Sequence, residues 1–191
     1  MDLETVNIDA KKTDQQYTVE NCVICEIGII KLDLDSGVTT PIFNNTCKED
    51  INPDPESWIF KNTPITCEMV KQSPHFDDFK DGLQELFNKN PATSWGHDFD
   101  FDHLKSPLRS ITIPTKFWDP KLVLTDLLKI PNPWREGYKW PRVAEAFKYF
   151  HPTSQWKQAH RAIDDAEIEA DIIFRTVKKW PFLKDQWADF V

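Results

Sequence analysis

Three stretches of the sequence hold carboxylates and histidines at spacings that suit metal chemistry. The first is "MDLETVN", which contains Asp2 and Glu4. If this stretch is extended, both side chains project from one face of a strand, about 7 Å apart, and can share a divalent cation. The alternative is a polar N-terminal segment without fixed structure.

The second stretch is "SWGHDFDFDHLK", residues 94–105, in which Asp98, Asp100 and Asp102 alternate with two phenylalanines. Burying a carboxylate is costly unless it is paired or bound to a metal. On pattern alone the segment is either an edge strand with an acidic face in water or the source of a metal ligand.

The third stretch is "AHRAIDDAEIEA", in which His160 precedes Asp165 by five residues. A histidine at the start of a helix and an aspartate more than one turn later can converge on one point. Histidine accepts a proton from water near neutral pH, so the pair suits general-base chemistry. The alternative is an ordinary helix N-terminus, where the helix dipole favours acids such as Asp164 and Glu167.

The elements that must position these residues follow from hydrophobic periodicity and from turn residues. Strands come mostly first and helices later, which predicts an α/β domain with a mixed sheet. Pro41 is expected at an edge or a bulge. We expect a long strand at 19–37, a hairpin partner for it at 38–44 and a short strand at 92–97, with a loop at 51–64. The expected helices are 75–89, one that begins near 102, 119–129, one after Pro141 and 160–178. The last of these helices carries Ala166, Ala170, Ile173 and Val177 on one apolar stripe.

Length and composition indicate one domain over residues 1–191, with 40% hydrophobic and 28% charged residues. We find no apolar run of membrane-spanning length and no secretory leader, so we expect a cytoplasmic protein without a membrane partner. The net charge is −8. Residues 1–95 carry −9 and residues 96–191 carry +1. A polyanion could therefore bind the second half while acids of the first half hold metal ions, although an acidic enzyme without such a partner fits equally well.

Four cysteines are present, and Cys22 and Cys25 have the spacing of a zinc knuckle. They lie inside an apolar run that predicts a strand, whereas a knuckle needs a turn. We therefore expect buried thiols rather than a zinc site.

Taken together, D-x-E, G-H-D-x-x-F-D and H-x-x-x-x-D resemble, in order and spacing, the DnaQ-like 3′–5′ exonucleases of the DEDD superfamily. In having a histidine five residues before the last aspartate, the chain resembles the histidine-type (DEDDh) branch of this superfamily. The tyrosine-type branch has tyrosine where this chain has Arg161. The resemblance covers nearly the whole chain, and "TKFWDPKLVLTDLL" resembles more narrowly the DexA-type exonucleases of phages. It implies a ribonuclease H-like α/β fold, with a mixed central sheet flanked by helices.

The resemblance also implies roles for individual residues. It implies two Mg²⁺ or Mn²⁺ ions, which prefer carboxylate oxygens, and a single-stranded DNA or RNA 3′ end as substrate, cut to 5′-mononucleotides. Asp98 would be structural and Asp100 would face solvent. The implied metal ligands are Asp2, Glu4, Asp102 and Asp165; the implied general base is His160; the implied substrate contacts are Leu3, Thr5 and Phe101.

Two departures from the family pattern leave other functions open. Only Met1 precedes the first aspartate where the family has several apolar residues, so either neighbouring strands hold Asp2 or the true start lies a few residues earlier. Val6 and Asn7 replace the usual Thr-Gly. The alternatives are a weakened or inactive DnaQ-like module that binds nucleic acid or a protein, and a hydrolase for another phosphate ester. The oligomeric state also stays open, a homodimer included.

One more stretch, "PNPWREGYKWPR" at residues 131–142, interleaves aromatic and basic residues. Such a pattern suits unpaired bases and phosphates. The alternative is a loop whose aromatic side chains cap the core, because tryptophan is usually well buried.

Overall fold

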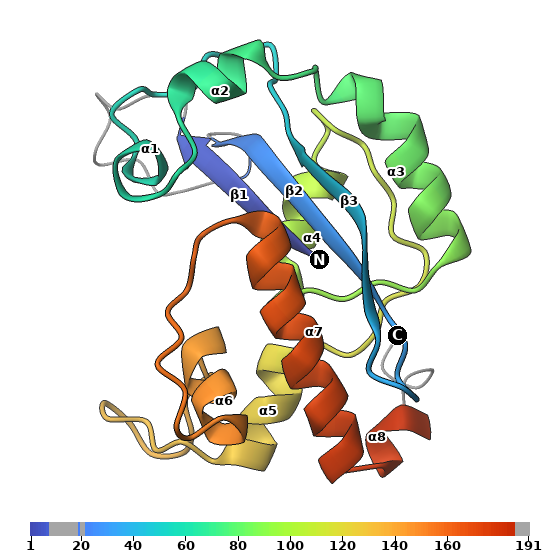
Figure 1. Cartoon of the computed structure of the whole chain (residues 1–191), viewed down its shortest axis with the longest axis vertical. Helices are drawn as coiled ribbons and strands as arrows, with labels where there is room; N and C mark the ends of the chain where they lie inside the picture. The colour runs from blue at the N-terminus through green and yellow to red at the C-terminus, as the bar shows by residue number, and fades with distance from the viewer. Residues whose placement is uncertain (8–18, 20–21, 186–191) are drawn as a thin grey trace.

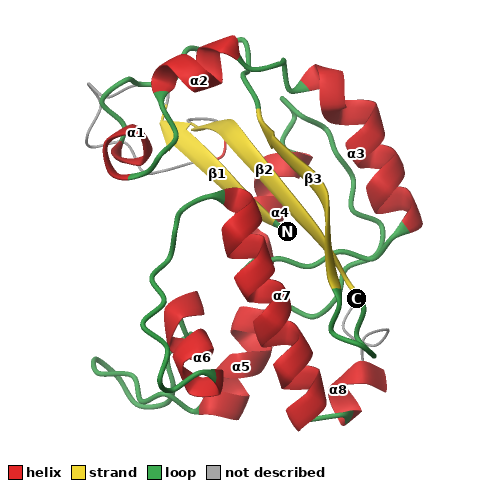
Figure 2. Cartoon of the chain, viewed as in Figure 1, coloured by secondary structure: helices red, strands yellow, loops and turns green. Residues whose placement is uncertain are grey.

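The computed structural model describes residues 1–7, 19 and 22–185 of the chain. Within these residues a small sheet is flanked by helices (Figures 1 and 2), which confirms the expected α/β architecture. The strands are β1 (Asp2–Asn7), β2 (Cys22–Leu32) and β3 (Thr39–Thr46); the helices are α1 (Trp58–Asn62), α2 (Cys67–Gln72), α3 (Asp77–Lys89), α4 (His97–Lys105), α5 (Pro120–Leu128), α6 (Val143–Phe150), α7 (Ala162–Lys179) and α8 (Phe182–Asp185).

The sheet has the strand order β1-β2-β3, with both pairings antiparallel. β2 is buried along most of its length because it lies between its two neighbours. The predicted hairpin of β2 and β3 is confirmed. The register shifts where Ile29 pairs with Phe43 and Ile30 pairs with Pro41, so the expected bulge lies beside the proline of this edge strand. The expected mixed sheet is antiparallel in the described part of the chain, where parallel pairing occurs only in isolated bridges outside the strands.

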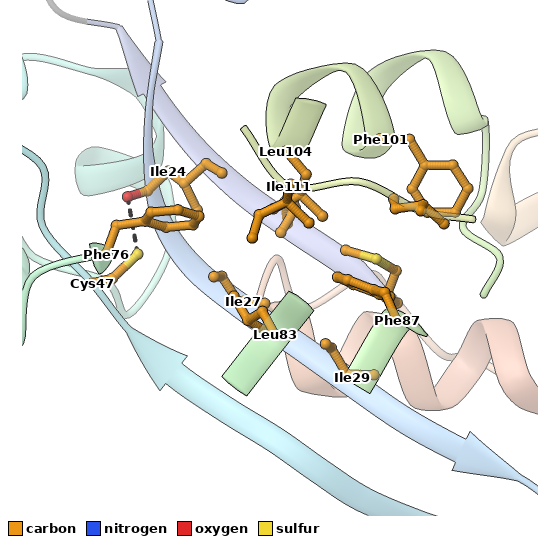
Figure 3. Close-up of a cluster of buried hydrophobic side chains, with 13 residues drawn as sticks. Ile24, Ile27, Ile29, Cys47, Phe76, Leu83, Phe87, Phe101, Leu104 and Ile111 are labelled. Atoms are coloured by element: carbon orange, nitrogen blue, oxygen red, sulfur yellow. Dashed lines mark hydrogen bonds between the residues drawn. The ribbon is translucent and has the colours of Figure 1, made fainter. Parts of the chain in front are cut away.

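The main core lies between one face of the sheet and helices α3 and α4 (Figure 3). Leu3 of β1 and Ile27 of β2 pack there against Leu83 and Phe87 of α3 and Phe101 of α4. This packing fixes α4 beneath β1. The helices α3, α5, α6 and α7 were predicted close to their observed bounds, because each carries a clear apolar stripe.

The helix α7 packs against the opposite side of β2, where Gly28 permits a very close approach. A Cβ atom at Gly28 would lie 2.2 Å from the backbone carbon of Ala162. Glu26 of β2, fully buried, accepts hydrogen bonds from the N–H of Ala162 at 2.8 Å and from the guanidinium of Arg161 at 2.6 Å. The start of α7 is therefore held against the sheet by sterics and by charge.

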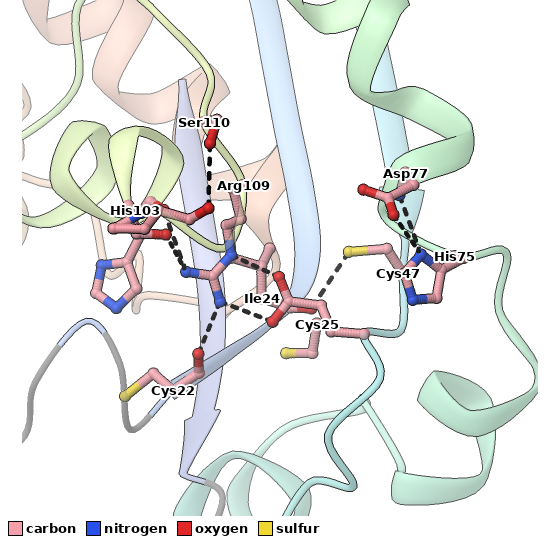
Figure 4. Close-up of polar contacts among 12 residues, drawn as sticks. Cys22, Ile24, Cys25, Cys47, His75, Asp77, His103, Arg109 and Ser110 are labelled. Atoms are coloured by element: carbon pink, nitrogen blue, oxygen red, sulfur yellow. Dashed lines mark hydrogen bonds and ion pairs between the residues drawn. The ribbon is translucent and has the colours of Figure 1, made fainter.

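A buried arginine ties the segment after α4 to the start of β2 (Figure 4). Arg109 is fully buried, forms an ion pair with Glu49, and donates to the carbonyl oxygens of Cys22 at 2.7 Å and His103 at 3.1 Å. Because an unpaired buried charge is costly, these contacts hold α4 in a defined place relative to the sheet.

Three local expectations are corrected. Residues 92–97 form no strand, because Ala92 makes only an isolated parallel bridge with Lys116. The helix expected near 102 begins five residues earlier, at His97. The expected loop at 51–64 contains α1, a helix of one turn.

Three of the four cysteines are buried thiols, as expected. Cys22, Cys25 and Cys47 are buried and unlinked, and the thiols of Cys25 and Cys47 donate to the carbonyls of Glu4 and Ile24, both at 3.2 Å. Across the described residues, no helix is both long and apolar enough to cross a membrane.

Candidate active site

Carboxylates from three separate segments gather beside the first turns of α7. They are Asp2 and Glu4 of β1, Asp100 of α4, and Asp165 and Glu169 of α7. The donor atoms of Glu4, His160 and Asp165 lie within 4.8 Å of one another, the one such group found among the described residues. The structure thus brings the first and third sequence motifs together as expected.

The two motif residues on β1 share one face, as predicted. Asp2 pairs with Gly28 and Glu4 pairs with Glu26, so both lie opposite the part of β2 that receives α7. The strand β1 is paired to β2 from Asp2 onward, so a neighbouring strand holds Asp2 in place.

The second motif contributes Asp100 rather than Asp102. Asp100 is 3% exposed, and its Oδ1 accepts a hydrogen bond from the backbone N–H of Leu3 at 3.1 Å. Asp102 is exposed. Its charged or titratable neighbours are Lys116 and His103, not the carboxylates of the cluster. Residues two apart on an α-helix point about 200° apart, so only one of these aspartates can face the site.

The phenylalanines are also displaced by two residues from the expected positions. Phe101 is fully buried in the core, with its ring centroid 4.6 Å from that of the tilted His97 ring, so it is not available to a substrate. Phe99 is 40% exposed and lines the pocket beside the cluster. Asp98 is exposed. The expectation that Asp100 faces solvent is therefore wrong, and Phe99 lies where Phe101 was expected.

His160 lies immediately before α7, in a left-handed backbone conformation with φ of 52°. Its ring meets that of Trp58 edge to face, at 4.9 Å between centroids. Both rings line a pocket of about 450 Å³ that also includes Asp2, Glu4, Thr5 and Phe99. The buried Leu3 lines the same pocket, so two of the three predicted substrate contacts border it.

The carboxylates of the cluster hold their protons more tightly than ordinary carboxyl groups. Burial, followed by the charge of Glu169, raises the pKa of Asp2 well above its ordinary value. Burial and the charge of Asp165 raise the pKa of Glu4 to about 8. Burial raises the pKa of Asp100 to about 7, and it also raises the pKa of Asp165. A bound cation would remove this penalty.

The residues present fit a divalent metal. Two buried oxygens, Oδ1 of Asp165 and Oε2 of Glu169, have no hydrogen-bond partner in the described structure. The cluster offers only carboxylate oxygens and one imidazole, which suits hard ions such as Mg²⁺ or Mn²⁺ better than thiophilic ones.

Sequence reasoning missed several residues that the structure brings to the site. Because "FDFD" repeats the same pair of residues, the F-D of the motif can be aligned with either pair. Only the early start of α4 decides which aspartate faces the site. Glu169 lies four residues after Asp165, and that spacing on a helix could have revealed it. Nothing in the sequence indicated Trp58, because it lies in a proline-rich stretch far from the motifs.

Comparison with known proteins agrees with this geometry. Residues 1–173 match the RNase_T family model, which describes an exonuclease. The chain is 25% identical over 175 residues to the 3′-5′ exonuclease DinG of Staphylococcus epidermidis and 23% identical to that of Staphylococcus haemolyticus. Each match covers 91% of this chain but only 18% of the relative, so the chain spans less than a fifth of these proteins.

Solved structures share the fold at low sequence identity. The nuclease domain of 3′hExo, a DEDDh family member bound to rAMP, has a TM-score of 0.70 at 14% identity, covering 93% of this chain and 90% of that one. Exonuclease X in complex with 5′ overhanging duplex DNA has a TM-score of 0.60 at 17% identity, covering 98% and 96%. The solved structures show the shared fold, and the match over residues 1–173 shows that this chain belongs to the RNase_T exonuclease family.

Proposed function

We propose that this chain is a metal-dependent 3′–5′ exonuclease that shortens single-stranded DNA or RNA from its 3′ end and releases 5′-mononucleotides. The observation that carries the proposal is the convergence of Asp2, Glu4, Asp100 and Asp165 beside His160, at a pocket that Asp2, Glu4 and His160 line. The family match over residues 1–173 supports a single exonuclease domain over residues 1–191.

In this proposal the four carboxylates hold divalent ions, Mg²⁺ or Mn²⁺, in the two-ion arrangement that the resemblance implies. Bound there, such ions stabilise the attacking and leaving oxygens of a phosphodiester. Asp100 takes the part that the sequence assigned to Asp102, because it is the buried aspartate that borders Asp2. Glu169, buried beside Asp165, adds a further carboxyl group to the inner wall of the site, and burial raises its pKa well above the ordinary value.

His160 is proposed as the general base. It accepts a proton from the water that attacks the terminal phosphorus, and its position within 4.8 Å of the Glu4 and Asp165 oxygens places it at the edge of the cluster. The contact with Trp58 orients the ring. Leu3, Thr5 and Phe99 border the same pocket and are proposed to contact the 3′-terminal nucleotide.

A labelled oligonucleotide assay tests the proposal. A 5′-labelled DNA or RNA strand, incubated with Mn²⁺ or Mg²⁺, should give a ladder that shortens from the 3′ end, and EDTA should abolish it. Asp165→Asn should also abolish it. Asp164→Asn is the matched control, since Asp164 is the exposed neighbour on α7 and should leave the ladder intact.

Two results would argue against this activity. Intact substrates in every combination of strand and metal would leave a module that only binds its partners. A ladder that persists in EDTA would mean that the carboxylate cluster does not supply the catalytic chemistry.

A further inference from the structure

The segment between α5 and α6 forms a short hairpin that the proposed reaction does not use. Pro131 and Tyr138 make an antiparallel bridge, and the N–H of Asn132 donates to the carbonyl of Gly137 at 3.0 Å. The N–H of Trp134 donates to the side chain of Asn132 at 2.9 Å. Gly137 has a φ of 95°, which glycine adopts easily. Residues 131–142, here called the aromatic hairpin, thus have a hydrogen-bonded stem with Trp134 in the turn.

The aromatic side chains of this hairpin face solvent. Trp134 is 92% exposed, Trp140 is 59% exposed and Tyr138 is 46% exposed. These values exclude a core-capping role for Trp134, because a ring this exposed buries almost no apolar surface. Large aromatic rings held in water at a fixed place are typical of surfaces that bind flat apolar partners.

The hairpin also carries positive charge, in contrast to the whole chain. Residues 131–142 contain three Lys or Arg and one Glu, whereas the chain has a net charge of −8. Arg135 and Arg142 are exposed. The ammonium group of Lys121 lies 4.9 Å from the ring centre of Trp140, which adds a cation beside the aromatic surface.

The base of the hairpin is joined to the wall of the candidate active site. The indole N–H of Trp95 donates to the carbonyl of Pro141 at 3.2 Å, and the backbone N–H of Trp95 donates to the carboxylate of Glu169. Trp95 directly precedes the turn into α4, the helix that carries Asp100. In Figure 1 the hairpin projects at the edge of the molecule beside α5 and α6, near the connection that leads up to the start of α7.

We propose that the aromatic hairpin is a stacking surface for unpaired bases of a nucleic-acid strand whose 3′ end lies in the carboxylate cluster. The inference rests on the proposed function for the position of that 3′ end. Stacking of bases on Trp134 and Trp140 needs no sequence match, and Arg135, Arg142 and Lys121 supply charge for the phosphates. The hairpin therefore favours substrates with several unpaired nucleotides over very short ones.

Binding and cleavage measured on strands of different length test this inference. Oligomers of two and of twelve nucleotides are used, as DNA and as RNA, with binding measured in EDTA by tryptophan fluorescence and by anisotropy of a labelled strand. Trp134→Ala should weaken binding of the twelve-nucleotide strand about tenfold and leave cleavage of the dinucleotide unchanged. Trp134→Phe should restore most of the binding. Phe182→Ala, which removes an exposed ring on α8, is the control and should bind as the original chain does.

The outcomes separate this inference from the proposed function. Equal binding of the long strand by the original chain and by Trp134→Ala would overturn the stacking surface while leaving the exonuclease proposal intact. Length-dependent binding that Trp134→Ala weakens, in a chain that cleaves nothing, would support the stacking surface and contradict the exonuclease proposal.

Discussion

The carboxylate of Asp100 accepts a hydrogen bond from the backbone N–H of Leu3 at 3.1 Å, across 97 positions of sequence. Leu3 lies between Asp2 and Glu4 on β1. This bond therefore joins the second acidic motif to the first and fixes Asp100 at the carboxylate cluster. Asp102, on the other side of α4, makes no comparable contact with β1 in the described structure.

Asp100 and Asp102 of α4 should differ sharply in their effect on catalysis when each is replaced. We expect Asp100→Asn to lower kcat of the exonuclease reaction about 100-fold or more, because the proposed metal-binding carboxylate is lost while an amide oxygen remains to accept from the N–H of Leu3. Asp102→Asn should keep kcat within about threefold, as is typical of an exposed position. Steady-state rates on a single-stranded oligomer measure both. Equal losses in the two variants would mean that Asp102 also reaches the site.

Gly28 should tolerate no side chain. In Gly28→Ala the new Cβ would lie 2.2 Å from the backbone of Ala162, so α7 must move away from β2 and carry Asp165 with it. We expect the free energy of unfolding to fall by about 1–3 kcal/mol and activity to fall with it. Gly82→Ala is the matched control, since a Cβ there meets nothing within 4 Å on α3; it should stabilise the chain by about 0.5–1 kcal/mol. Urea unfolding curves compare the two.

The sequence predicted the parts of the fold that strong periodicity controls. The hairpin of β2 and β3 and the helices α3, α5, α6 and α7 follow from apolar spacing and from turn residues. The site was predicted where each motif has one possible register, as at Glu4 and Asp165. The prediction of the metal-binding aspartate was wrong at "FDFD". Both aspartates there follow a phenylalanine, and only tertiary packing decides which phenylalanine enters the core. The predicted strand at 92–97 also failed, since a single isolated bridge leaves its backbone pairing incomplete.

Metal-free protein should lose stability as the pH rises. The pKa of Glu4 is raised from 4.5 to about 8 and that of Asp100 from 3.8 to about 7, so the folded chain binds these protons more tightly than the unfolded chain. The resulting stability is fully present below the unfolded pKa values and is lost as the pH passes through 7 to 8. Between pH 6.5 and 8, in EDTA, we expect the free energy of unfolding to fall by at least about 1 kcal/mol.

Two additions check the origin of this pH effect. Saturating Mn²⁺ should abolish most of the fall, because the cation replaces the protons. Glu4→Gln should make the metal-free fall smaller, since a glutamine cannot titrate and only the contribution of groups such as Asp100 remains. A stability that stays constant between pH 6.5 and 8 in EDTA, measured by denaturant unfolding, would contradict the raised pKa values.

His160 should matter for catalysis far more than for folding. We expect His160→Ala to lower kcat by about 10²–10⁴-fold while thermal stability changes little, because the proton acceptor is lost from the edge of the pocket. His151→Ala is the control; His151 pairs with Asp171 between α6 and α7, away from the cluster, and should keep kcat. Similar kcat values for His160→Ala and the original chain would exclude His160 as the base.

The most direct test of the account is a crystal soaked in Mn²⁺ and measured for anomalous scattering. We expect anomalous peaks at coordination distance from carboxylate oxygens of Asp2, Glu4, Asp100 and Asp165, with none at Asp102. A crystal that shows no Mn²⁺ at these oxygens under saturating metal, or shows it only at Asp102, would contradict the assignment of this cluster as the metal centre.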